Sequence, residues 1–176
     1  MTQIDARPPP ALKPDRIALG TPAVAHGAAI HRLIESCKPL DVNSLYAYLL
    51  LCEHHADTCV IAHRENEVVG FVSAYKVPAR ADTVFVWQVA VDAGTRGTGL
   101  AGAMLGELLA RPAVRSCAYL ETTVSPSNSA SRRLFHALAR KLDAPVNETL
   151  LFAESDFGGE EHECEMLIRI GPFQGK

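Results

Sequence analysis

The fold is decided by the run Val89-Ala-Val-Asp-Ala-Gly-Thr-Arg-Gly-Thr-Gly-Leu-Ala-Gly-Ala-Met-Leu105. It begins as the end of an apolar strand, passes through a glycine-rich turn, and ends as the start of a helix. Three glycines, Gly97, Gly99 and Gly102, fall within six residues at the helix start. Glycine lets a backbone approach a ligand closely. The first N–H groups of a helix are unpaired, and the helix dipole is positive at this end. The run therefore predicts a binding site for a pyrophosphate.

Within this run, Arg96, Gly99 and Ala101 fit the pattern R-x-x-G-x-[GA]. The pattern resembles the acyl-CoA binding loop of the GNAT N-acetyltransferases. The alternative is an ordinary glycine-rich strand-to-helix turn. A P-loop is excluded because no G-K-[ST] follows, and a Rossmann turn fits less well because no acidic residue follows at the expected distance. The resemblance implies that CoA is bound by Val89, Val91, Arg96, Gly97, Thr98, Gly99, Leu100, Ala101 and Gly102.

The composition favours one globular domain. The chain has 176 residues, of which 48% are hydrophobic, and its formal net charge is −3. No basic stripe indicates a nucleic-acid partner, and no apolar run approaches the roughly 18–20 residues of a membrane span. Residues 1–15 are polar and proline-rich, which predicts a disordered leader before a single domain over 16–172.

The five cysteines and seven histidines indicate neither a disulfide framework nor a metal site. The cysteine number is odd, and neither C-x-x-C nor H-E-x-x-H occurs. We therefore expect a reducing, cytoplasmic location and no bound metal.

The apolar periodicity predicts an alternating α/β fold. Strands are expected at 16–19, 58–62, 68–76, 81–91, 118–124, 149–154 and 165–170, and helices at 22–37, 45–54, 100–110 and 128–141. The helix over 45–54 is apolar nearly all round and is expected to be buried. This order is that of the GNAT fold, in which helices flank a mixed central sheet.

A second segment strengthens the resemblance. Asn128-x-x-Ser131-x-x-Leu134-Phe135 is similar to the GNAT pattern N-x-x-[AS]-x-x-L-[FY]. In that family the asparagine helps to hold the pantetheine arm of CoA, which lies between two diverging strands; as an alternative, Asn128 only caps a helix. Many members carry a tyrosine that protonates the leaving thiolate where this chain has Phe135, so that role is not carried over.

Two further segments are not general to the superfamily. They resemble the L-2,4-diaminobutyrate acetyltransferases, and the resemblance extends over residues 16–170. The first is Leu40-Asp-Val-Asn-Ser-Leu-Tyr-Ala-Tyr-Leu-Leu-Leu-Cys-Glu-His-His55, which leads into Thr58-Cys-Val-Ile-Ala62; the second is Val84-Phe-Val-Trp-Gln-Val-Ala-Val91, followed by Leu120-Glu-Thr-Thr-Val-Ser-Pro-Ser-Asn128. That resemblance implies transfer from acetyl-CoA to the 4-amino group of the diamino acid, giving the precursor of ectoine, and a homodimer. The competing hypotheses are a GNAT enzyme for another small amine or an aminoglycoside, and an acyl-CoA-binding domain without turnover.

A small zwitterion with a second ammonium needs carboxylates for its amines and donors for its own carboxylate. Asp41, Asn43 and Tyr46 lie between the first two helices, where GNAT acceptor sites commonly lie. We expect Asp41 to bind an ammonium and Asn43 to line the site. Tyr46 is the candidate acid for the thiolate. The alternatives are a helix cap for Asp41 and plain packing for Tyr46.

Three more side chains are candidates for the site. Trp87, the only tryptophan, is expected to wall the acceptor pocket. Glu121 lies on a central strand, where a carboxylate is costly to bury without a partner, and is the candidate general base; the alternative is a structural ion pair. His162 lies in an acidic loop over 155–163 that would fold over the substrate or remain solvated.

Overall fold

The computed structural model describes residues 17–159 and 161–173, so the whole predicted leader, residues 1–15, lies outside the described residues. A seven-stranded sheet has the strand order β1-β2-β3-β4-β5-β7-β6. All neighbours are antiparallel except β4 and β5, which are parallel. The strands are β1 (Ile17–Gly20), β2 (Val60–Arg64), β3 (Glu67–Lys76), β4 (Thr83–Val91), β5 (Tyr119–Val124), β6 (Val146–Phe152) and β7 (Glu165–Ile170).

The α-helices are α1 (Gly27–Ser36), α2 (Leu45–His54), α3 (Leu100–Ala110) and α4 (Ser129–Lys141). The predicted order of elements and the mixed sheet are confirmed. Within the described ranges, no helix combines the length and apolar character needed to cross a bilayer.

Most boundaries agree with the prediction to within two residues, and two elements begin three or more residues away from their expected starts. The first helix begins later, because a 3₁₀ turn over Val24–His26 precedes α1 and is closed by a hydrogen bond from the Ala23 N–H to His26 Nδ1. Strand β6 begins at Val146, three residues before the expected start. Its first residues pair with Ile170 and Arg169 of β7, and no local pattern reports such a pairing.

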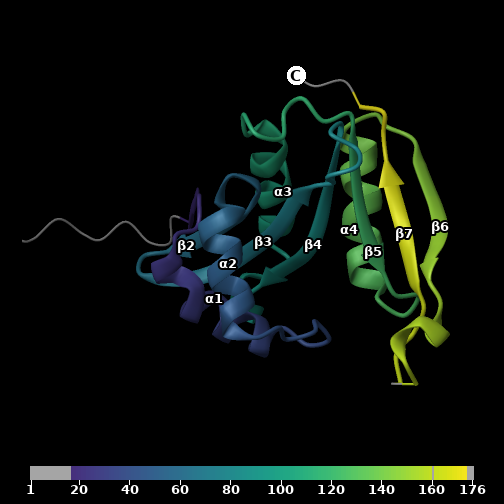
Figure 1. Ribbon diagram of the computed structural model, residues 1–176. Helices are drawn as coiled ribbons and strands as arrows, with labels where there is room; N and C mark the ends of the chain where they lie inside the picture. Colours follow the sequence, from purple (N-terminus) through teal and green to yellow (C-terminus); the bar gives the residue numbers. More distant parts are fainter. Residues whose placement is uncertain (1–16, 160, 174–176) are drawn as a thin grey trace, which may run out of the picture.

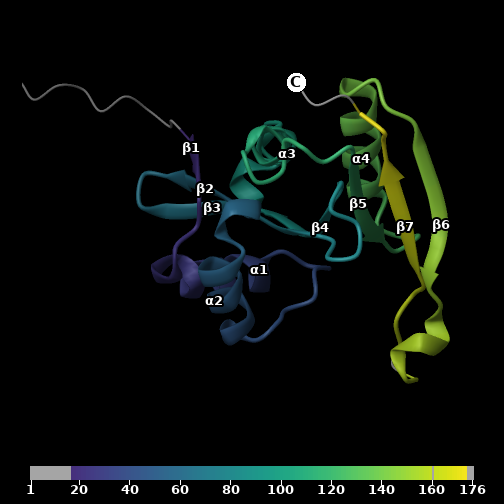
Figure 2. The ribbon, with the colours of Figure 1, turned by 45° about the horizontal axis from the view of Figure 1, so that its top comes forward.

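Helices cover the two faces of the sheet unequally (Figures 1 and 2). On one face, α1 and α2 pack on β2, β3 and β4 through a cluster that includes Ile30, Tyr48 and Phe71. On the other face, α3 and α4 share one larger core with the strands, including Met104 and Ile168. The helices α1 and α2 do not extend over β5, β7 and β6, so this part of the sheet keeps an open face (Figure 2).

The parallel strands β4 and β5 form a fork. Only Thr83–Val86 of β4 pairs with β5, and beyond Val86 the two strands diverge (Figure 1). From Trp87 to Val91, β4 has no strand partner on that side among the described residues. Backbone N–H and C=O groups along this edge are therefore available to a ligand that lies in the fork.

Arg111, the residue that follows α3, connects the end of this helix to the end of β1 and to the turn before β2. Its side chain is 8% exposed and donates hydrogen bonds to the carbonyl oxygens of Ala56, Cys59 and Gly20. These acceptors lie at the end of β1 and around the turn before β2. The guanidinium thus supplies charged donors to three backbone carbonyl oxygens, of which that of Cys59 is buried.

Replacing Arg111 by methionine should therefore lower the free energy of unfolding by about 3 kcal/mol, because three carbonyl oxygens, one of them buried, lose a charged donor. Urea denaturation with an unchanged slope measures this loss. Arg115→Met, at an exposed position on the same connection, is the matched control. Equal stability of the two variants would show that the Arg111 contacts contribute nothing.

Candidate active site

The glycine-rich turn has the backbone geometry that a bound anion needs. Gly97 and Gly99 have positive φ angles of 78° and 84°, and Gly99 is the N-cap residue of α3. A Cβ atom added at Gly97, Gly99 or Gly102 would meet nothing within 4 Å. The backbone of this turn therefore borders open space, and the unpaired N–H groups at the start of α3 face no packed side chain there.

A cavity of about 450 Å³ adjoins the turn. Its wall combines the diverging edge of β4, the turn itself, the start of α4 and the segment 37–40. Of the predicted cofactor residues, all but Thr98 line it; the Thr98 hydroxyl instead donates to the Thr95 carbonyl at 2.7 Å. The lining residues that were predicted are Val89, Val91, Arg96, Gly97, Gly99, Leu100, Ala101, Gly102 and Asn128.

Asn128 fits both roles considered for it. Its side chain caps α4 by accepting from the Ser131 N–H at 3.1 Å, and the residue also lines the cavity at the fork. Arg96 is exposed and donates from Nε to the Val91 carbonyl at 3.2 Å, which holds its guanidinium at the cavity wall.

A second cavity of about 680 Å³ lies on the open face of the sheet. Strand β4 contributes Phe85 and Trp87 to it, and Val89 and Val91 to the cavity at the fork. The two cavities therefore lie end to end along β4. The rest of the wall is largely apolar or aromatic and consists of Tyr75, Val77, Arg80, Glu121, Thr123, Leu151, Phe152, Leu167 and Arg169.

Trp87 occupies the bulge of β4. Ser73 pairs with Gln88 and Ala74 with Val86, so Trp87 is the extra residue with no partner on β3. A bulge re-aims a side chain. The indole is 43% exposed and lines the open-face cavity, as the expected pocket wall would.

Glu121 is held in an ion-pair network, the alternative that the sequence left open. The residue is 2% exposed, and its two carboxylate oxygens accept from Arg80 and Arg169 separately. The Arg169 guanidinium also lies 3.8 Å above the ring centroid of Tyr119. A buried carboxylate with both oxygens bound to guanidinium groups presents no free oxygen to an amine. The geometry therefore argues against Glu121 as the general base.

An acidic cluster instead lies next to Thr123, one of the residues that line the open-face cavity. Loop 155–163 brings His162 Nε2 to 3.8 Å from the Asp41 carboxylate, while the imidazole stacks on Phe157 with centroids 3.9 Å apart. Glu165, the first residue of β7, accepts a hydrogen bond from Thr123, which lines the cavity. Asp41, His162 and Glu165 are thus neighbours.

This environment changes the pKa values of two of these groups. Burial raises the pKa of Glu165, and the Thr123 hydrogen bond and the positive charge of His162 oppose that rise. The hydrogen bond to the Glu163 carbonyl raises the pKa of His162, and attraction to Asp41 and Glu165 adds to it. A carboxyl whose pKa is raised by burial is better matched to accept a proton near neutral pH.

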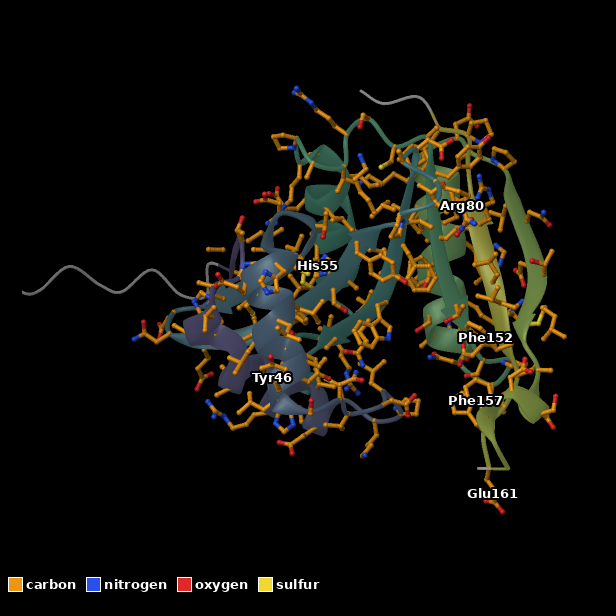
Figure 3. The ribbon with its side chains drawn as sticks, in the orientation of Figure 1. Tyr46, His55, Arg80, Phe152, Phe157 and Glu161 are labelled. Atoms are coloured by element: carbon orange, nitrogen blue, oxygen red, sulfur yellow. The ribbon has the colours of Figure 1, made fainter. Side chains whose placement is uncertain are left out.

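The remaining candidates between α1 and α2 are not brought to either cavity. Tyr46 is 67% exposed on α2 and lines neither (Figure 3), so the geometry gives no support to its role as an acid. Asn43 does not line a cavity either, and Ser44 caps α2. The tyrosine that is buried is Tyr48, whose hydroxyl donates to Gln88 at 3.3 Å. Gln88 in turn donates to the Asp41 carbonyl at 2.7 Å, which ties the Asp41 loop to β4.

Comparison with known proteins identifies the family. Residues 28–139 match the acetyltransferase (GNAT) family. L-2,4-diaminobutyric acid acetyltransferase from Bordetella parapertussis is 55% identical over 159 residues, which cover 90% of this chain and 86% of the relative. The enzyme of the same name from Methylotuvimicrobium alcaliphilum is 47% identical over 90% of this chain and 92% of the relative.

The chain belongs to the diaminobutyrate acetyltransferases of the GNAT family. Among solved structures, it is similar to diaminobutyrate acetyltransferase EctA from Paenibacillus lautus, determined in complex with L-2,4-diaminobutyric acid and coenzyme A. The TM-score is 0.88 at 41% identity, and the match covers 92% of this chain and 98% of that chain. The expected fold is thereby confirmed for this acetyltransferase.

Sequence reasoning missed two charged residues that line the open-face cavity, Arg80 and Arg169, and a third, Glu165, that lies beside its lining residue Thr123. Arg80 follows β3 in a loop, and Arg169 and Glu165 lie on β7. The alternation of Glu165, Leu167 and Arg169 indicates that all three face the same side of the strand, since successive side chains point to opposite faces. That alternation was visible in the sequence, whereas the pairing of Glu121 with arginines 41 and 48 residues away was not.

Proposed function

We propose that this protein transfers the acetyl group of acetyl-CoA to the 4-amino group of L-2,4-diaminobutyrate. The observation that carries the proposal is the similarity, over nearly the whole chain, to a structure that holds this diamino acid and coenzyme A. The two cavities that lie end to end along β4 supply a cofactor site and an acceptor site. The product is the acetylated precursor that the family resemblance connects to ectoine.

Acetyl-CoA is proposed to occupy the cavity at the fork. The N–H groups of the turn around Gly97 and Gly99, together with Arg96, bind the pyrophosphate, because the turn and the helix start present donors and positive potential. The pantetheine arm pairs with the free edge of β4 beside Val89 and Val91. This places the thioester near Trp87, where the acceptor cavity begins.

The terminal amine reaches the thioester from the acidic cluster. Asp41 and Glu165 provide negative charge for an ammonium that enters beside Trp87. The proposed binding of the ammonium can be tested by a single substitution at Asp41.

Replacing Asp41 by asparagine should raise the dissociation constant for diaminobutyrate roughly tenfold, the low end of the range for a charge-assisted hydrogen bond, because Asp41 is 84% exposed. Affinity for acetyl-CoA should not change. Calorimetric titration with each ligand measures both values, with Asp57→Asn as a control at an exposed aspartate outside both cavities. Wild-type affinity for the diamine in the Asp41 variant would show that Asp41 does not bind the substrate.

The ammonium must lose a proton before its nitrogen can attack. Deprotonating an amine with a pKa of about 10.4 at pH 7 costs roughly 4–5 kcal/mol. We assign proton removal to Glu165, directly or through one water, in place of Glu121. Glu165 borders the cavity through Thr123, and its pKa is raised by burial.

The remaining steps need few protein groups. The amine nitrogen bonds to the thioester carbon, and backbone N–H groups on the free edge of β4 near Val89 stabilise the oxyanion. The C–S bond then breaks and the thiolate leaves, while the nitrogen loses its second proton to water and becomes the amide nitrogen. Phe135 is buried and has no hydroxyl, so no acid is assigned at that position. A thiol with a reference pKa near 8.5 leaves without a dedicated acid.

Release of the CoA thiol with a panel of amines separates the candidate functions. We expect diaminobutyrate to react far better than lysine, ornithine, putrescine or an aminoglycoside. Faster turnover of another amine would favour a different acetyltransferase. Tight acetyl-CoA binding without release on any amine would favour a binding domain.

We also propose that the protein is a cytoplasmic homodimer. Three consecutive apolar side chains of β6, Leu150, Leu151 and Phe152, are exposed; Leu151 and Phe152 line the acceptor cavity, whereas Leu150 lines neither cavity and is the one that supports contact with a second copy. The five free cysteines support a reducing compartment. Sedimentation of the wild type and of Leu150→Lys tests the first proposal, and a monomeric wild type would overturn it.

A further inference from the structure

Arg80 and Arg169 bring more positive charge to the open-face cavity than their partner neutralises. Both guanidinium groups contact the single carboxylate of Glu121. Glu121 is enclosed, whereas the side chains of Arg80 and Arg169 are 46% and 28% exposed. Both side chains border the cavity and keep N–H donors that Glu121 does not occupy, so one unit of positive charge is left over. Since Arg80 and Arg169 both line a largely apolar wall, this charge is available to an anion.

The two ends of the cavity carry opposite charge. Along β7, Glu165 lies at the acidic end and Arg169 at the basic end, with Leu167 between them on the same face. Figure 3 shows Arg80 above Phe152 along this part of the sheet, and Phe152 is the register partner of Glu165. A ligand bound here thus has its cationic end at Glu165 and its anionic end at the arginines.

The spacing matches the diamino acid. Four residues of strand separate the Cα atoms of Glu165 and Arg169 by roughly 13 Å. Extended diaminobutyrate spans roughly 5 Å from its 4-nitrogen to its carboxylate carbon, and a hydrogen bond at each end brings the total to about 11 Å. Side chains on one face of a strand project in the same direction, so the length of the ligand with its two hydrogen bonds is commensurate with the spacing of Glu165 and Arg169.

We propose that Arg80 and Arg169 bind the carboxylate of the acceptor, and that this anchor selects the 4-amino group. The inference rests on the proposed function and adds to it a carboxylate subsite. The α-amine has the lower reference pKa, near 8 against about 10.4, so basicity alone favours the wrong nitrogen. A carboxylate fixed at the far end holds the adjacent α-amine away from the thioester and leaves the terminal amine beside Trp87. Glu121 is then a positioning residue that holds both guanidinium groups in place.

Arg80→Gln tests the subsite with two substrates, because Glu121 keeps its ion pair with Arg169 in this variant. Diaminobutyrate is compared with 1,3-diaminopropane, which is the same diamine without the carboxylate. We expect kcat/KM for diaminobutyrate to fall roughly ten- to hundredfold, with less than about a twofold change for diaminopropane. The share of 2-N-acetyl product should rise. Arg140→Gln, at an exposed position in the last turn of α4, is the matched control.

The outcomes are separable. A wild type that does not acetylate diaminobutyrate contradicts the proposed function itself. A wild type that does so, with an Arg80→Gln variant of equal kcat/KM and equal regioselectivity, overturns the carboxylate subsite alone. An equal fall in kcat/KM for both substrates also overturns it, because the arginine then stabilises the site without binding the carboxylate. Unchanged kinetics with weakened self-association would assign these arginines to a second copy of the chain.

Discussion

Replacing Glu165 by glutamine should lower kcat for diaminobutyrate at pH 7 by roughly 10²- to 10⁴-fold, the range that general acid–base catalysis contributes. The amide keeps the size of the side chain and its hydrogen bond with Thr123, but it cannot take up the proton of the ammonium. The loss should shrink as the pH rises toward 10, where free amine becomes abundant. Stopped-flow or steady-state thiol release from pH 6 to 10 measures this profile.

The wild-type profile follows from the direction of the Glu165 pKa shift. The base form is the carboxylate, so activity is lost as the pH falls through the pKa of this group. Because burial raises that pKa, the acid limb should lie above the ordinary glutamate range. Glu163→Gln is the matched control, since the Glu163 carboxylate is at the surface and accepts from the Ser127 N–H, and the substitution leaves the Glu163 carbonyl that contacts His162 in place. A folded Glu165→Gln enzyme with normal kcat between pH 7 and 9 would exclude Glu165 as the base.

Replacing Gly99 by valine should raise KM for acetyl-CoA roughly a hundredfold while KM for the diamine changes little. Gly99 has φ 84°, a conformation in which a β-branched side chain costs about 1–3 kcal/mol. Its added atoms would also project beside the turn that the phosphates approach. Either effect disturbs the N–H groups at the start of α3.

The same substitution at Gly106 is the control for the Gly99 variant. Gly106 lies within α3, does not line the cofactor cavity, and has nothing within 4 Å of an added Cβ. Gly106→Val should leave both KM values near wild type. Circular dichroism establishes that both variants fold. An acetyl-CoA KM that is unchanged in folded Gly99→Val would contradict the role of the turn.

The cofactor half of the site was predictable because its information is local. A glycine turn between an apolar strand and a helix fixes its own backbone geometry. Gly97 and Gly99 adopt positive φ angles, which glycine permits. The fork between β4 and β5 followed only from the family resemblance, since strand divergence leaves no local mark. Thr98 belongs to the quoted motif but turns its hydroxyl to Thr95, a detail that spacing cannot give.

The acceptor half was less predictable because long-range contacts decide it. Glu121 was expected to face the cleft, and it does line the cavity, but arginines from two distant segments occupy its oxygens. Tyr46 was chosen over Tyr48 by its place after a loop, yet only Tyr48 is buried against the sheet. The apolar composition of α2 predicted a buried helix, whereas Leu45 and Leu50 are 41% and 37% exposed.

The central claim is tested most directly by the structure of the product. Wild-type protein is incubated with L-2,4-diaminobutyrate and acetyl-CoA labelled with ¹³C at the acetyl carbonyl, and the product is read by heteronuclear NMR. We predict a single main product in which the labelled carbonyl couples to the protons on C4. A main product coupled through the α-carbon, or no acetylated diamine under conditions where another amine reacts, would contradict this account.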